Sequence, residues 1–271
     1  MKIGFIGAGN MGEAYISALN EENQIFFYEQ SAERRSYIEQ NYKAESCNNY
    51  EDLIKKSDYV VIAVKPQVVV KLLVSLSKIN ISDKIFISIV AGLKIAKMED
   101  ILGENRKVVR VMPNTPALIG KGISGVTYGS MITEEDTDNI LNIISSTGKY
   151  VVVEENQQDI VTAISGSGPA YVFMLINSLA EGGVKLGMTK KAALELAVET
   201  FIGSAELIKS TGKHPEELKD MVTSPGGTTA AGLFKMEENG IRKSMIETVE
   251  AAFHRARDLG KDGDKKWFYF L

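Results

Sequence analysis

Residues 2–12 read KIGFIGAGNMG, an apolar strand pattern that runs directly into the spacing G-x-G-x-x-G and then into a helix. Each glycine has a use in that context: Gly7 permits a tight turn, Gly9 lets the backbone approach a pyrophosphate, and Gly12 allows close packing of helix on strand. Free amides at the helix N-terminus would face the phosphates. A glycine-rich turn that binds nothing is the alternative, but the surrounding strand and helix favour a dinucleotide site. The residues expected there are Gly7, Gly9, Asn10, Met11 and Gly12.

The first half of the chain continues this alternation of strands and helices. Further strands are expected at residues 24–29, 59–64, 84–89, 107–112, 123–128 and 149–154, with helices between them, for example at 32–40 and 68–77. The run 59–64 is apolar almost throughout, as strands covered by helices on both faces require. Thr133 followed by Asp136 indicates a helix start of capping-box type. The pattern predicts an α/β fold with a doubly wound, largely parallel Rossmann-type sheet.

The second half of the chain lacks strand patterns after about residue 156. Helices are expected at residues 170–186, 190–209, 216–222, 230–238 and 242–259, and an irregular tail at 262–271. We therefore predict two domains that meet near Gln157: a dinucleotide-binding domain at 1–157 and an all-helical domain at 158–271.

Composition and charge argue against several other classes of protein. The chain has 271 residues, is 44% hydrophobic and 24% charged, and carries a formal net charge of -4, so nothing indicates nucleic acid as a partner. Its single cysteine, Cys47, cannot form an internal disulfide, which suits a reducing compartment. No stretch has the eighteen or so uninterrupted apolar residues of a membrane span, and the N-terminus lacks a signal-peptide pattern. These features predict a cytoplasmic protein that binds neither nucleic acid nor membrane.

The end of the second expected strand carries conflicting signals about the cofactor. Glu29 stands where a carboxylate binds the adenosine ribose hydroxyls and favours NADH. Ser31, Arg34 and Arg35 follow closely, and a hydroxyl with guanidinium groups suits the 2′-phosphate of NADPH. The two arginines could equally form a solvated helix face. The sequence therefore predicts NADPH or NADH without deciding between them.

Two further loops lie at the carboxyl ends of expected strands, the edge where open α/β sheets bind ligands. One is Ala63-Val64-Lys65 before Pro66, and the other is the turn Ala91-Gly92. Lys65 is either a cofactor contact or an exposed lysine before a proline that starts a helix. We expect both loops in the cofactor site.

The chain offers no obvious histidine for acid–base catalysis. Its two histidines are His214, which precedes a proline at a helix start, and His254, which lies in a charged helical stretch. Both are interpreted as capping or surface residues. This absence favours a substrate such as a protonated imine, which can accept a hydride without a strong acid from the protein. No residues are expected to hold a metal.

Residues 224–229 read SPGGTT and form a second glycine-rich loop before a helix that begins near Thr228. Exposed amides at such a helix start can cradle a small carboxylate, and the Thr229 hydroxyl could bond a ring nitrogen. A plain turn with a serine or threonine N-cap is the alternative. The stretch 165–171, SGSGPAY, is a similar glycine-rich loop before a helix, and close packing of helices explains part of its glycine content.

Together these segments resemble the pyrroline-5-carboxylate reductase family. The matching stretches lie in family order and span the chain from residue 3 to about residue 260. They are GAGNMG (7–12), AVKP (63–66), MPNTP (112–116), SGSGPAY (165–171), EGGV (181–184) and SPGGTT (224–229). The strings SGSGPAY and SPGGTT together are far more specific than the first glycine-rich loop alone.

The resemblance implies hydride transfer from NADPH or NADH to the cyclic imine Δ1-pyrroline-5-carboxylate, which gives proline. Thr229 would meet the imine nitrogen, and Asn114, within residues 112–115, would line the nicotinamide end with Ala91-Gly92. The resemblance also implies a homodimer or an oligomer of dimers, with interlocked C-terminal helices and each site completed by the partner. The residues that would hold the substrate carboxylate are Ser224, Gly226, Gly227, Thr228 and Thr229.

Two departures from the family pattern concern the cofactor alone. Tyr50 stands where the family often has an asparagine near the adenosine, and Glu29 replaces a small or polar residue. Two other kinds of function stay open: another imine or hydroxyacid reductase of the same architecture, and a non-catalytic NAD(P)-binding sensor. A hydroxyacid dehydrogenase of this build would need a catalytic lysine on the first long helix of the second domain. Lys185 lies at the far C-terminal end of that expected helix, which counts against this function. A non-catalytic NAD(P)-binding sensor would leave the SPGGTT loop without a purpose.

Overall fold

The computed structural model describes residues 1–103 and 105–267. Within this part of the chain the contacts define two compact units. The first comprises Met1–Ser167 together with the last helix, α12 (Ile241–Trp267), from Ala252 onward; the second comprises Gly168–Ala251.

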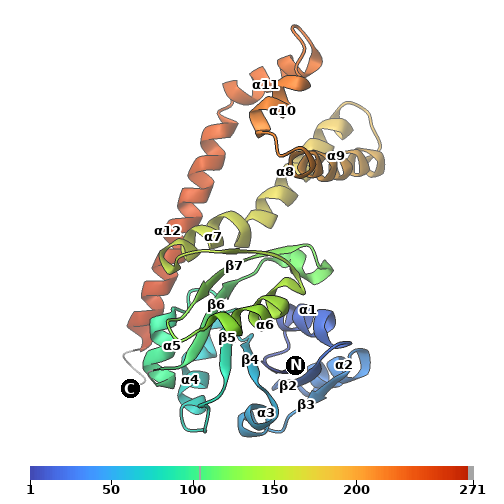
Figure 1. Cartoon of the computed structure of the whole chain (residues 1–271). Coiled ribbons are helices and arrows are strands. Elements are labelled where there is room, and N and C mark those ends of the chain that lie inside the picture. The colour runs from blue at the N-terminus through green and yellow to red at the C-terminus, as the bar shows by residue number, and fades with distance from the viewer. Residues whose placement is uncertain (104, 268–271) are drawn as a thin grey trace. The chain divides into compact units, whose positions relative to one another are not determined.

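The first unit is built on an eight-stranded sheet, counted over the described residues (Figure 1). Its order is β3-β2-β1-β4-β5-β6-β7-β8, and all neighbours are parallel except the antiparallel pair β6 and β7. The direction of strand succession reverses between β1 and β4, as in a doubly wound sheet. The strands are β1 (Lys2–Ile6), β2 (Gln24–Tyr28), β3 (Ala44–Ser46), β4 (Tyr59–Ile62), β5 (Ile85–Ser88), β6 (Lys107–Met112), β7 (Gly122–Tyr128) and β8 (Gly148–Val152).

Helices cover both faces of this sheet and enclose two separate apolar cores (Figure 1). Alternate residues of a strand point to opposite faces, so Val61 of β4 joins one core and Val60 joins the other. Helices α1 (Asn10–Leu19), α2 (Ala32–Asn41) and α6 (Glu134–Ser145) close the first core. Helices α3 (Tyr50–Lys56), α4 (Pro66–Leu76) and α5 (Ile95–Leu102) close the second. Burial on both faces is the reason why these strands are nearly continuous apolar runs.

The Rossmann-type fold predicted from the sequence is confirmed, with small differences in detail. The seven expected strands are present, each within two residues of the expected ends, and the capping box of Thr133 and Asp136 starts α6. The sequence pattern did not predict β3, because its three residues Ala44–Ser46 include no apolar run and none of them is fully buried.

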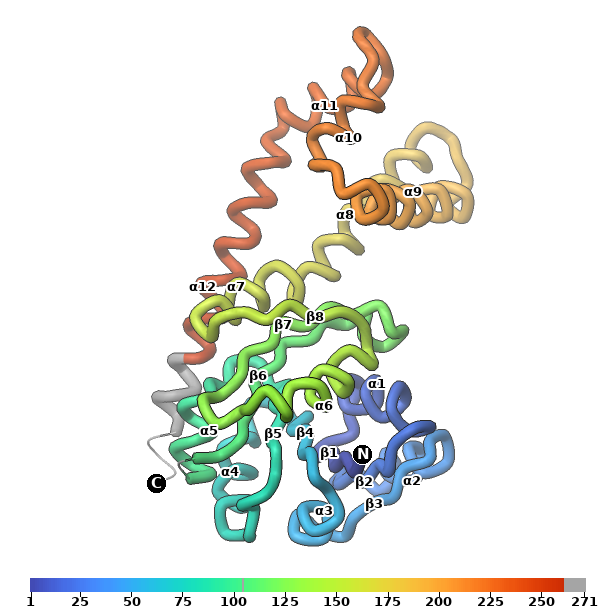
Figure 2. Tube along the Cα trace, viewed as in Figure 1, coloured from blue at the N-terminus to red at the C-terminus, as the bar shows by residue number. Residues whose placement is uncertain are grey.

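The second unit contains helices and no strand among its described residues. Its helices are α8 (Gly168–Lys185), α9 (Lys190–Thr211), α10 (Pro215–Met221), α11 (Thr228–Glu238) and the first part of α12. Helices α8 and α9 lie side by side (Figure 2) and share the small buried residues Ala180, Ala193 and Ala197. Many larger apolar side chains of this unit stay exposed, among them Phe173 at 62%, Leu186 at 89% and Phe234 at 76%.

Most of the connection from β8 to α8 is helical. It consists of the 3-10 turn η2 (Glu155–Gln157), α7 (Gln158–Val161) and the π-helical turn η3 (Thr162–Gly166). The stretch Glu155–Lys185 is long and apolar enough to cross a membrane by length and composition, and only 6% of its most apolar window is buried. The expectation of an irregular tail at 262–271 is wrong for its first part, since α12 continues to Trp267; the rest of that expectation lies outside the described residues.

Candidate functional sites on the two units

The glycine-rich loop after β1 has the shape that its spacing predicts. Gly7 has a φ of +96°, and a Cβ added there would lie 2.6 Å from the carbonyl oxygen of Ala63. A Cβ on Gly12 would lie 2.5 Å from the carbonyl oxygen of Gly7, so neither position has room for a side chain. A Cβ on Gly9 would meet nothing within 4 Å. The open space above Gly9 is where a phosphate could approach the backbone.

The start of α1 is free to bind an anion. Gly9 is the N-cap, and no side chain caps the helix. Asn10 and Met11 are the first helical residues, so their amides lack partners within the helix. This arrangement fits the pyrophosphate of a dinucleotide, because partial positive charge and unpaired N–H groups meet at the same point.

The other cofactor residues expected from the first half lie at or near the same edge of the sheet. Ala63 follows β4, the strand beside β1 at the point where the sheet order reverses. Lys65 is exposed and forms the N-cap of α4, with Pro66 at the first helical position. Ala91 and Gly92 follow β5, and Gly92 has a φ of +77°. Ligands of doubly wound sheets bind at this edge.

Glu29 lies immediately after β2 and binds two backbone amides. Its Oε2 accepts a hydrogen bond from the amide of Ala8 at 3.0 Å, and its Oε1 accepts one from the amide of Ser31 at 3.0 Å. Ser31 is the N-cap of α2, where its hydroxyl accepts from the amide of Arg34 at 3.2 Å. The carboxylate therefore joins the glycine-rich loop to the start of α2.

Both arginines that follow Glu29 bind groups within the chain. Arg34 donates from Nε to the carbonyl oxygen of Ala8 at 2.6 Å and forms an ion pair with Glu13 of α1. Arg35 donates from Nη1 to the carbonyl oxygens of Glu29 at 2.6 Å and Gln30 at 3.0 Å. No sequence pattern singles out Glu13; its only signal is its place as an acidic residue in the first turn of a helix.

Glu13 is held as a carboxylate by its neighbours. Burial raises the pKa of its carboxyl, but hydrogen bonds from the Tyr42 hydroxyl, 2.7 Å away, and from Arg34 outweigh this and lower it overall. Burial and the contact with Glu13 in turn raise the pKa of Tyr42 to about 12. A charged Glu13 keeps Arg34 in place beside the glycine-rich loop.

Asn114 and Met112 both make contacts that stabilise the fold. The buried Asn114 accepts a hydrogen bond at Oδ1 from the amide of Ile123, 3.0 Å away, which closes the turn between β6 and β7. A Cβ on Gly166, in the π-helical turn, would lie 2.7 Å from the Met112 methyl group. This contact is with the flexible end of the Met112 side chain, which could move aside, so close packing explains the first glycine of SGSGPAY only in part. π-Helical turns are frequent at functional sites, and the sequence pattern did not predict this one.

A buried arginine ties the helical connection to the sheet. The side chain of Arg110 on β6 is 5% exposed and lies 3.3 Å from Oε1 of Glu155 and 3.6 Å from Oδ1 of Asp159. The same Glu155 oxygen accepts the amide of Ile95 at 2.8 Å. A single arginine in a strand pattern is not a sequence signal for such a contact, since its partners lie 45 and 49 residues away.

The SPGGTT loop of the second unit leads into α11 as expected. The helix begins at Thr228 with Gly227 as its N-cap, and no side chain caps it. Gly226 has a φ of +69°, and the amide of Gly227 donates to the carbonyl oxygen of Ser224 at 3.0 Å. Thr229 is half-buried in the first turn. Since Ser224 does not cap the helix, the alternative of a plain capped turn is not what the structure shows.

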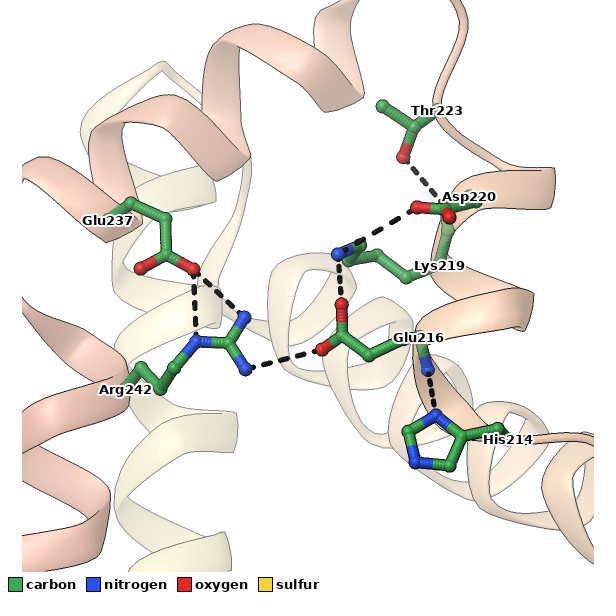
Figure 3. A network of polar contacts seen from close by, with 7 residues as sticks. All are labelled: His214, Glu216, Lys219, Asp220, Thr223, Glu237 and Arg242. Atoms are coloured by element: carbon green, nitrogen blue, oxygen red, sulfur yellow. Dashed lines mark hydrogen bonds and ion pairs between the residues drawn. The ribbon is translucent and has the colours of Figure 1, made fainter.

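A network of ion pairs ties together the elements that flank this loop (Figure 3). Arg242 of α12 lies 3.3 Å from Glu216 of α10 and 3.0 Å from Glu237 of α11. Glu216 also pairs with Lys219, and these contacts with Lys219 and Arg242 lower the pKa of the Glu216 carboxyl. Thr223, just before the loop, donates to the carbonyl oxygen of Lys219 at 2.6 Å. The network links α10, which precedes the loop, to the end of α11 and the start of α12.

The two histidines lie where the sequence placed them. His214 is the N-cap of α10, where its Nδ1 accepts from the amide of Glu216 at 3.3 Å. His254 is exposed on α12. Lys185 is the last residue of α8. Among the described residues there is no group of three or more His, Cys, Asp or Glu that could hold a metal ion.

The sheet order and the glycine-rich loop define a Rossmann-type nucleotide-binding protein with a helical second unit. Family models agree: "NADP oxidoreductase coenzyme F420-dependent" matches residues 2–92, and "Pyrroline-5-carboxylate reductase dimerisation" matches residues 155–259. The pyrroline-5-carboxylate reductase of Arabidopsis thaliana is 39% identical over 96% of both chains, and that of Methanosarcina acetivorans is 40% identical over 96% of this chain and 98% of its own. The chain belongs to the pyrroline-5-carboxylate reductase family.

A solved structure of the same family agrees over the whole fold. The Plasmodium falciparum pyrroline carboxylate reductase, crystallised with NADP bound, is 34% identical to this chain. The two superpose with a TM-score of 0.86 over 96% of this chain and 98% of the other.

Proposed function

We propose that this protein is an NAD(P)H-dependent oxidoreductase that reduces the C=N bond of Δ1-pyrroline-5-carboxylate to give L-proline, the last step of proline biosynthesis. The observation that carries the proposal is the presence of two uncapped, glycine-rich helix starts on one chain, at α1 and α11. One suits a pyrophosphate and the other a small carboxylate. Relatives named for this activity, similar over nearly the full length, support the same conclusion.

The residues of the first unit would bind the cofactor. The amides of Asn10 and Met11 would hold the pyrophosphate above Gly9, and Glu29 would take the adenosine ribose. We assign the nicotinamide end to the neighbourhood of Ala91-Gly92 and Asn114. When bound, the reduced nicotinamide supplies the hydride. The protein itself needs no redox group for this reaction.

The residues of the second unit would bind the substrate. The amides at the start of α11, together with Ser224, Gly226, Gly227 and Thr228, would hold the carboxylate, and the Thr229 hydroxyl would bond the ring nitrogen. A protonated imine already carries the positive charge that accepts a hydride, so orientation of the two reactants would supply most of the rate enhancement. The positions of His214 and His254, one capping a helix and one exposed, suit a mechanism without a histidine acid.

We further propose that the protein works as a homodimer, or as a larger assembly of dimers, in the cytoplasm. Helices α8 and α9 expose Phe173, Met174 and Leu196 by 57% or more, which is costly unless another surface covers them. A dimer built on these helices would bury them and would account for the apolar stretch Glu155–Lys185 without a membrane. The functional domains would then be residues 1–157 for the cofactor and 158–271 for substrate binding and dimerisation. Light scattering after gel filtration should give twice the chain mass or an even multiple of it.

The test of the reaction is the oxidation of NADPH and of NADH by the purified protein with Δ1-pyrroline-5-carboxylate, with proline identified as the product. Turnover to proline supports the proposal. Binding of either cofactor without turnover would contradict it and would favour another imine reductase or a non-catalytic sensor. Unchanged cofactor oxidation in a mock reaction without the imine would expose a contaminating oxidase.

A further inference from the structure

The adenosine end of the cofactor site holds one carboxylate whose contacts are all within the first unit. Glu29 is fixed at both oxygens, by the amide of Ala8 at 3.0 Å and by the amide of Ser31 at 3.0 Å. A carboxylate oxygen has two lone pairs, so each oxygen keeps one free after these bonds. Two free lone pairs on a fixed carboxylate suit two ribose hydroxyls, which both carry a proton to donate.

A 2′-phosphate would meet this carboxylate unfavourably. The phosphate has only acceptor oxygens to offer and adds a charge of about -1.5 to -2 at neutral pH, by analogy with other phosphate monoesters. Its oxygens could not donate to Glu29, and the two like charges would repel each other. The amides of Ala8 and Ser31, which would otherwise be available to an anion, are already bound to Glu29.

The groups that could compensate this repulsion are held by contacts within the chain, which already use some of their donors. Arg34 is bound to the Ala8 carbonyl oxygen and to Glu13, and Arg35 is bound to two backbone carbonyl oxygens. The Ser31 hydroxyl caps α2. Releasing Arg34 for a phosphate would leave Glu13, whose side chain is only 18% exposed, without its cation. Such a loss is costly for a partly buried ion pair.

We propose that Glu29 makes this protein prefer NADH over NADPH, with Arg34 serving the glycine-rich loop instead of a 2′-phosphate. The inference rests on the proposed function, because it assumes that the first unit binds a nicotinamide dinucleotide. It distinguishes this chain from the Plasmodium falciparum relative, whose structure contains NADP.

The first test is the dissociation constant of the intact protein for NADH and for NADPH, measured by isothermal titration calorimetry without substrate. Repulsion between the two like charges, weakened by surrounding water and salt, implies that NADH binds at least about tenfold more tightly. Equal or tighter binding of NADPH would overturn the inference, even where turnover to proline stands. Failure of both dinucleotides to bind would overturn this inference and the proposed function together.

Three variants identify the cause of the preference. Glu29→Gln keeps the size of the side chain and removes its charge, so the ratio of the two dissociation constants should move about tenfold toward NADPH. Glu33→Gln is the matched control, because Glu33 is an exposed acid in the first turn of α2 and should leave the ratio unchanged. A shift of the same size in the control would contradict the role of Glu29.

Arg34→Ala separates the two possible roles of the arginine. Since Arg34 holds the loop at Ala8, the variant should weaken NADH and NADPH binding by the same factor. A loss confined to NADPH would show that Arg34 is a phosphate ligand and would overturn the inference. The wild-type ratio decides the question independently, even where a variant fails to fold.

Discussion

Gly9 and Gly12 lie three residues apart, and their replacement by alanine should affect different properties. Gly12→Ala should lower the stability of the fold, whereas Gly9→Ala should weaken cofactor binding. A Cβ at Gly12 would lie 2.5 Å from the carbonyl oxygen of Gly7 and 3.3 Å from the Ala63 Cβ. An ordinary carbon–oxygen contact is about 3.3 Å, so the overlap is about 0.8 Å against a backbone atom that has no rotamer to change. At Gly9 the same Cβ would meet nothing within 4 Å.

The cost of Gly12→Ala follows from these distances. Overpacking of this kind costs about 1–3 kcal/mol, and the upper half applies because the backbone must move. Alanine recovers about 1 kcal/mol of helix propensity inside α1, which leaves a net loss of about 1–2 kcal/mol in the free energy of unfolding. Gly9→Ala should cost less than about 1 kcal/mol, the difference between glycine and alanine at an N-cap.

The assay combines urea unfolding with calorimetric titration of NADH. Gly12→Ala should unfold at lower urea concentration. Gly9→Ala should unfold near the wild-type midpoint but bind NADH at least tenfold more weakly, because its methyl group fills the space proposed for the pyrophosphate. A Gly9→Ala protein that binds NADH normally would refute the argument, and so would one that loses as much stability as Gly12→Ala.

Three further predictions follow from separate parts of the structure. Arg110→Met should lower the free energy of unfolding in urea by about 2–3 kcal/mol, because it leaves Glu155 without its cation, and a wild-type value would contradict the buried contact. Thr229→Ala should lower kcat with little change in the dissociation constant of the cofactor, whereas an equal loss of cofactor binding would exclude the proposed role. Burial, with a smaller contribution from Asp52, raises the pKa of the Cys47 thiol from 9.0 to about 11. The native thiol should therefore react slowly with a disulfide reagent at pH 8, and its contribution to stability should be complete below pH 9.0 and be lost as the pH rises through about 11.

The parts of the fold that the sequence predicted are those with a local cause. The burial of β4 on both faces appears directly as an apolar run, and the start of α11 is marked by Gly226 and Gly227. The three-residue strand β3 was missed, because pairing with β2 and not its own composition makes it a strand. The continuation of α12 beyond Leu259 was missed for a similar reason, since its charged end gives no apolar periodicity to follow.

The cofactor site also has one part that the local sequence predicts and another that depends on tertiary contacts. The glycine spacing of residues 7–12 specifies its own turn, because only glycine tolerates the close approaches found at Gly7 and Gly12. Whether Glu29 or Arg34 decides the cofactor could not be settled from their order in the chain. Side chains compete for the same partners in space, and the partner of Arg34 proved to be Glu13, twenty-one residues away.

The sequence by itself thus determined the class of fold, the two glycine-rich loops and the family, because turns, helix starts and apolar runs arise from neighbouring residues. Only the tertiary structure decided that Glu29 binds the amide of Ala8 and that Arg110 reaches Glu155, because these contacts depend on how the strands are ordered in the sheet. Charges far apart in the chain acquire their roles only when burial brings them together and removes the water that would otherwise screen them.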